Sequence, residues 1–149
     1  MDDAQAKATR AAMAQAVSDQ QQPGPELNAA VARAIGWPYR EWKDKRGREC
    51  CAWEPTTGGT IAPGLWRPST DIADAMRAAD AMREAGWTVE FCIEEPYAWV
   101  VLSDFDSERP HRAEAEVLYA DTQGDRLAAL CLAICRAVVE AGQSKEDER

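Results

Sequence analysis

The chain is poor in the residues that build metal centres and disulfide frameworks. It contains one histidine, His111, and its five cysteines form no CxxC pair. Zinc sites need several Cys or His ligands at set spacings, and an odd number of cysteines cannot all pair within one chain. Cys131 and Cys135 stand four residues apart in an apolar helical pattern, which predicts two reduced, buried thiols. We therefore expect no bound metal.

Long hydrophobic runs and nucleotide-binding motifs are also missing. No apolar run approaches the roughly 20 residues that span a bilayer, and the first residues lack the basic start and apolar core of a secretory signal. The glycine-rich patterns of P-loops and dinucleotide-binding folds do not occur. His111 falls in a predicted surface loop, and Glu94 and Glu95 adjoin a predicted turn, so no nucleophile–base set stands out. The sequence favours a cytoplasmic, non-enzymatic protein without a cofactor or a membrane partner.

Positive charge is scarce. The chain has 17 Lys and Arg against 26 Asp and Glu, a net charge of −9, which argues against a nucleic-acid partner. The imbalance is uneven: residues 71–121 hold 13 acidic and four basic residues, whereas residues 37–68 hold four acidic and six basic ones. The acidic centre either serves solubility or attracts a basic partner, as a surface that imitates nucleic acid would.

Three segments space their apolar residues every three or four positions, which predicts amphipathic helices. They cover about residues 25–35, 71–85 and 125–141. The second helix is expected to begin at Ser69, Thr70 or Asp71, because each side chain can accept hydrogen bonds from the first free amides. Gly142 is expected to end the third helix.

Strands are predicted at 49–53, 88–94, 97–104 and 113–120. The second and third are separated by Glu95-Pro96, and a loop of two or four residues there would place their apolar residues on one face. Those residues are Val89, Phe91, Ile93, Ala98, Val100 and Leu102. A three-residue loop would scramble this arrangement, because a one-residue shift moves every side chain to the other face.

The predicted fold is therefore α+β: an antiparallel meander of three to four strands layered with helices, as in an alpha-beta-alpha sandwich. The sandwich domain is expected to cover residues 25–141. Residues 1–22, rich in alanine and glutamine, are expected to form an appended helix, and residues 142–149 a disordered, charged tail.

Three segments resemble the phage ABA (alpha-beta-alpha) sandwich domain family. They are Leu27–Trp37 (LNAAVARAIGW), Pro68–Ala75 (PSTDIADA) and Arg126–Ala137 (RLAALCLAICRA), in that order. The resemblance spans roughly residues 25–141 and implies a small accessory protein of tailed phages or prophages, with a sheet between helical layers. It implies no catalytic residues.

The candidate binding residues gather around an irregular, tryptophan-rich stretch between residues 37 and 70. Aromatic and arginine side chains are favoured anchors of binding surfaces, and a helix start can hold an anion. The candidates are Trp37, Trp42, Arg46, Trp66, Arg67, Ser69 and Thr70. One hypothesis is a surface that binds a host protein or a second copy of the chain, in host takeover or anti-defence. The alternative is a site that sequesters a small anionic or nucleotide-like ligand. Packing of this stretch onto its own domain, and simple capping by Ser69–Asp71, are the competing interpretations.

Overall fold

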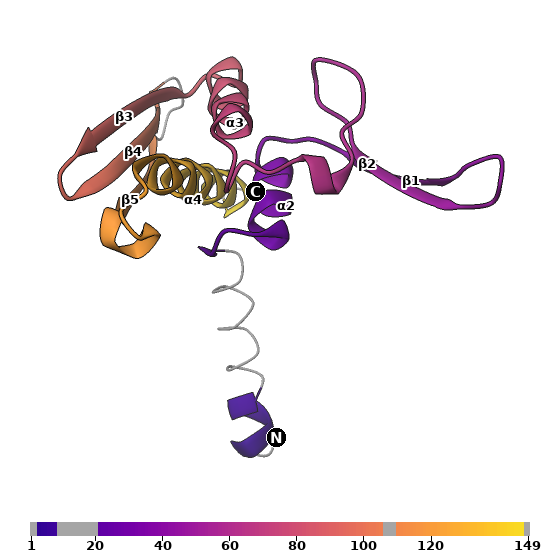
Figure 1. Ribbon diagram of the computed structural model, residues 1–149, viewed down its shortest axis with the longest axis horizontal. Coiled ribbons are helices and arrows are strands. Elements are labelled where there is room, and N and C mark those ends of the chain that lie inside the picture. The colour runs from indigo at the N-terminus through magenta and orange to yellow at the C-terminus, as the bar shows by residue number, and fades with distance from the viewer. Residues whose placement is uncertain (1–2, 9–20, 106–109, 148–149) are drawn as a thin grey trace.

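The computed structural model describes residues 3–8, 21–105 and 110–147 (Figure 1). The helices are α2 (Pro25–Ala34), α3 (Ile72–Glu84) and α4 (Arg126–Asp147), with short 3₁₀ turns η1 (Pro63–Leu65) and η2 (Tyr119–Thr122). The strands are β1 (Tyr39–Lys43), β2 (Glu49–Trp53), β3 (Thr88–Glu94), β4 (Tyr97–Asp104) and β5 (His111–Leu118). The predicted α+β class is confirmed. Residues 3–8 are helical, and the rest of the predicted appended helix, residues 9–20, lies outside the described residues.

Strands β3, β4 and β5 form an antiparallel meander in that order. Glu94 pairs with Tyr97, so the β3–β4 loop has two residues, a length that the apolar pattern allows. Val89 faces Leu102 and Phe91 faces Val100, which confirms the predicted shared face. β5 begins at His111 rather than at residue 113, so His111 belongs to a strand and is half-buried instead of lying in a surface loop.

Helix α4 is the centre of the core. It packs on β4 and β5 along one side and on α2 and α3 along the others (Figure 1). Ala98, Val100 and Leu102 of β4 are fully buried beneath it, together with Ile134 and Val138 of α4. The apolar face of the sheet and the apolar stripes of the helices therefore close on one another, as the sequence predicts.

The length of α4 corrects two predictions. The helix passes through Gly142 and continues to Asp147, so the tail predicted to be disordered from residue 142 is helical to that residue. Gly142 does not end the helix: a Cβ at this position would lie 2.8 Å from the Cβ of Ala34, so glycine allows α2 to approach α4 closely. The part of α4 from Arg126 to Ser144 is also long and apolar enough to cross a membrane, which the sequence analysis did not predict. Of its apolar stretch, 56% is buried inside the protein, as expected for a core helix.

The start of α3 is built as predicted, with Asp71 as the capping residue. The Asp71 Oδ1 atom accepts hydrogen bonds from the amides of Ala73 (2.9 Å) and Asp74 (3.3 Å). These bonds satisfy two of the free N–H groups of the first turn. The carboxylates of Asp71 and Asp74 also complement the positive end of the helix dipole.

Residues 39–53 form a hairpin that projects from the body, and we call it the arm (Figure 1). The sequence predicts its second strand, β2, at 49–53, whereas β1 falls in the stretch predicted to be irregular. All five residues of β1 are exposed. Because neither face of β1 is buried in the core, β1 lacks the apolar alternation by which a half-buried strand is identified.

Candidate binding groove and arm

The structure divides the seven candidate residues among three environments. Trp37, Arg67 and Thr70 line one groove, and Trp42 and Arg46 lie on the arm. Two further candidates are buried, and their prediction as contact residues is corrected. These are Trp66, with no exposed surface, and Ser69, which is 2% exposed.

Trp66 and Ser69 join α2 to the segment that precedes α3. The Trp66 indole Nε1 donates a hydrogen bond to the backbone oxygen of Asn28 (2.9 Å). The Ser69 amide donates to Asn28 Oδ1 (2.9 Å), and the Ser69 hydroxyl accepts from the amide of Gly24 (3.1 Å). Buried polar groups are costly unless they are hydrogen-bonded, and these bonds meet that need. Both side chains therefore hold the wall of the groove and do not face a ligand.

The aromatic ring of Trp66 also supports that of Trp37. The two ring centroids are 4.5 Å apart and the planes are tilted by 49°. The Arg77 guanidinium from α3 lies 5.6 Å from the Trp37 ring and 6.0 Å from the Trp66 ring. Such aromatic and cation–π contacts fix ring orientation beyond what burial alone achieves. Trp37 is thereby held as a rigid wall residue, 6% exposed.

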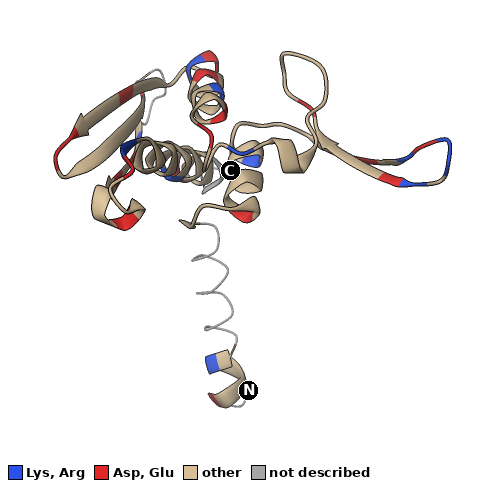
Figure 2. Cartoon of the chain, in the orientation of Figure 1, with Lys and Arg blue, Asp and Glu red and all other residues tan. Residues whose placement is uncertain are grey.

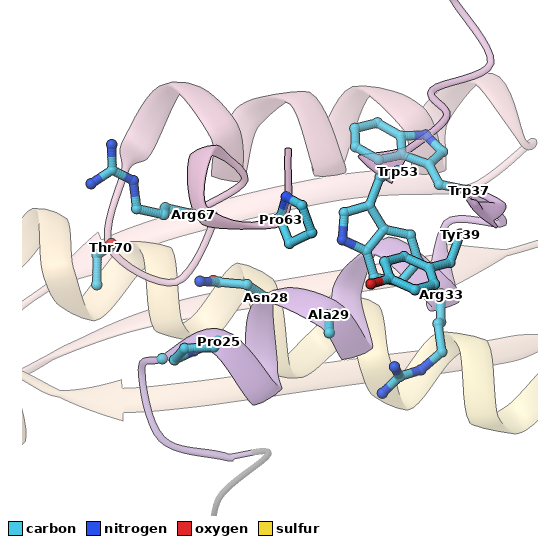
Figure 3. Close-up of a pocket in the computed structure, with 12 residues that line it drawn as sticks. Pro25, Asn28, Ala29, Arg33, Trp37, Tyr39, Trp53, Pro63, Arg67 and Thr70 are labelled. Atoms are coloured by element: carbon cyan, nitrogen blue, oxygen red, sulfur yellow. The ribbon is translucent and has the colours of Figure 1, made fainter. Parts of the chain in front are cut away.

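The groove has a volume of about 800 Å³ and runs between α2, η1 and the base of the arm (Figure 3). This volume falls within the range of about 300–1,000 Å³ typical of ligand sites. Its lining comprises Gly24, Pro25, Asn28, Ala29, Arg33, Trp37, Tyr39, Trp53, Pro63, Gly64, Arg67 and Thr70. In Figure 3 the rings of Trp37, Tyr39 and Trp53 gather at one end and Arg67 and Thr70 lie at the other. The lining is therefore mainly apolar, with cations at its margin.

A few polar groups are placed to orient a guest. Asn28 is 7% exposed and projects from α2 along the floor of the groove (Figure 3). Its Oδ1 is held by Ser69, and its Nδ2 makes no hydrogen bond with any described residue. Gly24, which precedes α2, offers no side-chain cap to the first turn of that helix. Arg33 and Arg67 are exposed at the margin. The Asn28 Nδ2 and the two guanidinium groups are donors, so this part of the groove favours an acceptor or an anion.

The arm carries a second hollow that continues the first. It has a volume of about 480 Å³ and is lined by Tyr39, Glu41, Trp42, Lys43, Glu49, Cys50 and Cys51. Tyr39 belongs to both linings and is 48% exposed. A hydrogen bond with the side chain of Cys51 is the main cause that raises the pKa of Tyr39. The groove and the hollow on the arm therefore adjoin at this residue.

The outer part of the arm presents an aromatic ring and positive charge. Trp42 is 39% exposed, and the Arg40 guanidinium lies 5.7 Å from its ring. At the tip, Asp44 Oδ1 accepts hydrogen bonds from the amides of Arg46 (2.8 Å) and Arg48 (2.9 Å), which closes the turn. The bond from the Arg48 amide is the main reason that the pKa of Asp44 is lowered. Lys45 and Arg46 make no ion pair with the described residues and are exposed.

The cysteines behave as the sequence predicts. Cys131 and Cys135 are buried in α4, and burial raises the pKa of Cys131 to about 11 and that of Cys135 further still. Both are free thiols in the structure, and so are the other three cysteines. Of two further tryptophans, Trp87 is buried, whereas Trp99 is half-buried and its indole Nε1 donates a hydrogen bond to Glu114 Oε2 (3.2 Å).

Four groove residues were missed by the sequence reading: Asn28, Arg33, Tyr39 and Trp53. One of them left a visible signal. Asn28 adjoins Leu27 within the predicted apolar stripe of α2, and a polar residue on a buried stripe needs a specific partner. Nothing local in the sequence places Tyr39 or Trp53 near α2, because the hairpin register that brings them together is a long-range feature.

Comparison with family models, with curated proteins and with solved structures finds no match for this chain. The resemblance to the phage ABA sandwich domain family therefore stays a prediction. The case for function accordingly depends on the groove and the arm themselves.

Proposed function

We propose that this protein is a non-enzymatic accessory protein that binds an extended segment of a partner protein along the groove and the arm. The observation that carries the proposal is that the two hollows adjoin at Tyr39, which lines both. Two adjoining hollows suit an extended chain better than a small molecule. The resemblance to a phage family makes a host protein in the cytoplasm the expected partner, bound in host takeover or anti-defence.

The chemistry of the groove supports binding rather than turnover. Among the residues that the structure describes, its lining includes no histidine, cysteine or carboxylate, the groups that most often act as nucleophile or general base. It offers aromatic walls and donors, with Arg33 and Arg67 exposed at the margin. Aromatic and arginine side chains carry much of the free energy of protein interfaces. The segment that fits is apolar, with acidic residues on either side.

The test is to fill the groove without removing any core side chain. Ala29 lies on the floor of the groove, so Ala29→Trp places an indole where the partner segment would lie. Ala73→Trp is the matched control, because Ala73 is exposed on α3 outside the groove. We expect the wild type and the control to retain the same protein from a host lysate, and Ala29→Trp to lose it. Equal capture by all three chains would contradict the proposal.

A second candidate function has an observation of its own. The Nδ2 atom of Asn28 is free of partners among the described residues, and it shares the groove with the Thr70 hydroxyl and the Arg67 guanidinium. A small anion with a flat ring would meet donors at this end of the groove and aromatic side chains at the other. Sequestration of a nucleotide-like ligand would use this arrangement.

Thermal denaturation with a panel of nucleotides separates the two candidates. A ligand that binds the folded state alone stabilises it by about 2.7 kcal/mol at a concentration of 100 times Kd. We expect Arg67→Ala to abolish such stabilisation and Arg83→Ala, on α3, to leave it intact. A panel without any stabilising member would remove the nucleotide candidate and leave the protein-binding proposal untouched.

A further inference from the structure

The face of the sheet that points away from α4 has a definite pattern of chemistry. Along β4, Tyr97, Trp99 and Val101 form an apolar line, and the neighbouring strands place carboxylates beside it. The cross-strand rows are Glu90–Val101–Glu114, Cys92–Trp99–Glu116 and Glu94–Tyr97–Leu118. All four of these glutamates are exposed and Leu118 is 43% exposed, whereas Tyr97 and Trp99 are half-buried and Val101 is 4% exposed. We call these residues the open sheet face.

The carboxylates of this face are largely uncompensated. Glu114 pairs with Arg112 (3.3 Å), whereas Glu90 and Glu116 make no ion pair with the described residues. Like charges gathered on one surface raise its negative potential and attract a basic partner. An apolar line with acidic margins therefore calls for an apolar element with basic margins.

The arm has that complementary pattern. Residues 39–53 contain five basic and three acidic residues. Trp42 is exposed on one face of the hairpin, and Lys45 and Arg46 stand at its tip. Figure 2 shows blue residues at the end of the arm and red residues along the strands of the sheet. An isolated two-stranded hairpin is of marginal stability in water, so a docking surface for it is physically favourable.

The arm cannot reach the open sheet face of its own chain, because the two lie at opposite ends of the molecule (Figure 1). We propose that the arm of one copy docks on the open sheet face of a second copy. The contact is head-to-tail, so each copy offers one free arm and one free sheet, and assembly can continue beyond a dimer. This self-association extends the proposed binding function to a second copy of the chain and does not depend on the groove.

Analytical ultracentrifugation over a range of protein concentrations tests the proposal. The average mass is expected to rise above the 16.4 kDa of one chain as concentration increases. Raising NaCl from about 0.1 M to about 1 M shortens the Debye length from about 10 Å to about 3 Å and should weaken the assembly. A chain that stays monomeric at every concentration and at low salt overturns the proposal.

Charge reversal identifies the surfaces. K45E/R46E reverses the arm tip, and E90K/E116K reverses both margins of the open sheet face. Each variant alone is expected to raise the apparent Kd of self-association about tenfold or more. Mixing the two should restore assembly, because the native arm of one meets the native sheet of the other. Structural damage cannot produce this rescue, so a mixture that stays monomeric contradicts the assigned surfaces.

Two controls and one contrast complete the design. Lys7→Glu and Glu84→Lys change exposed charges outside both surfaces and should leave the assembly as in the wild type. Ala29→Trp, which fills the groove, should also leave it unchanged. Loss of assembly in Ala29→Trp would mean that the groove itself holds the second copy, which would overturn the sheet as the docking surface. Failure to find a host partner would leave the self-association result unaffected.

Discussion

Trp66 and Trp42 have the same side chain and nearly opposite surroundings, so replacing each by alanine tests the architecture of the groove. Trp66 is fully buried and donates a hydrogen bond to Asn28, whereas Trp42 is 39% exposed on the arm. A buried tryptophan removes roughly 200 Å² of surface from water, which at about 25 cal/mol per Å² corresponds to at most about 5 kcal/mol. Measured Trp-to-Ala losses in cores are about 3–5 kcal/mol.

We therefore expect Trp66→Ala to lower the free energy of unfolding by about 3–5 kcal/mol. Trp42→Ala should lower it by about 1 kcal/mol, chiefly through loss of the contact with Arg40. Trp66→Phe keeps an aromatic ring but loses the indole hydrogen bond, for an intermediate loss of about 1–2 kcal/mol. Urea denaturation followed by circular dichroism measures all three. Losses for Trp66→Ala and Trp42→Ala that agree within about 0.5 kcal/mol would refute the assignment of Trp66 to the groove wall.

Three further predictions concern the helices and the thiols. Asp71→Ala should lower the free energy of unfolding by about 1 kcal/mol through loss of the α3 cap, and Asp71→Asn should lower it much less. Thermal denaturation measures both, and equal losses would contradict the cap. Gly142→Ala should lower the free energy of unfolding, measured in urea, by about 1–3 kcal/mol, because the added Cβ would lie 2.8 Å from the Cβ of Ala34. This clash outweighs the higher helix propensity of alanine, so a more stable variant would contradict the close approach of α2 and α4. Cys51 should react with a thiol reagent at pH 8 in the folded protein, whereas Cys131 should not, because it is buried and its pKa is raised to about 11. The folded state favours the neutral Cys131 thiol, so stability is retained below the ordinary pKa of about 9 and declines as pH rises toward 11.

Much of the fold was predictable because its signals are local. Strict apolar alternation in β3 and β4 is visible in the sequence, and the structure supplies the loop length of two residues that places both apolar sets on one face. The α3 start follows from Asp71 directly before the first helical residue. The end of α4 was not predictable in this way. Gly142 has the sequence appearance of a helix stop, and its role depends on Ala34, more than 100 positions away in the chain.

The site was predictable in part for the same reason. Three of the residues proposed from the sequence, Trp37, Arg67 and Thr70, do line one groove. It could not distinguish the buried Trp66 from the exposed Trp42, because both have cations nearby in the chain. What separates them is the hydrogen bond from Trp66 to Asn28, which lies far away in the sequence. It also missed Tyr39, whose importance comes from its position where the groove meets the arm.

The most direct test of the proposed binding surface is hydrogen exchange of the protein alone and with the captured partner. The proposal predicts that two sets of amides become protected when the partner binds: those in the first turns of helix α2, and those of strands β1 and β2. The amides of β3 should exchange as they do in the protein alone. Protection confined to β3–β5, with the arm and α2 unaffected, would contradict the assignment of the groove and arm as the binding surface.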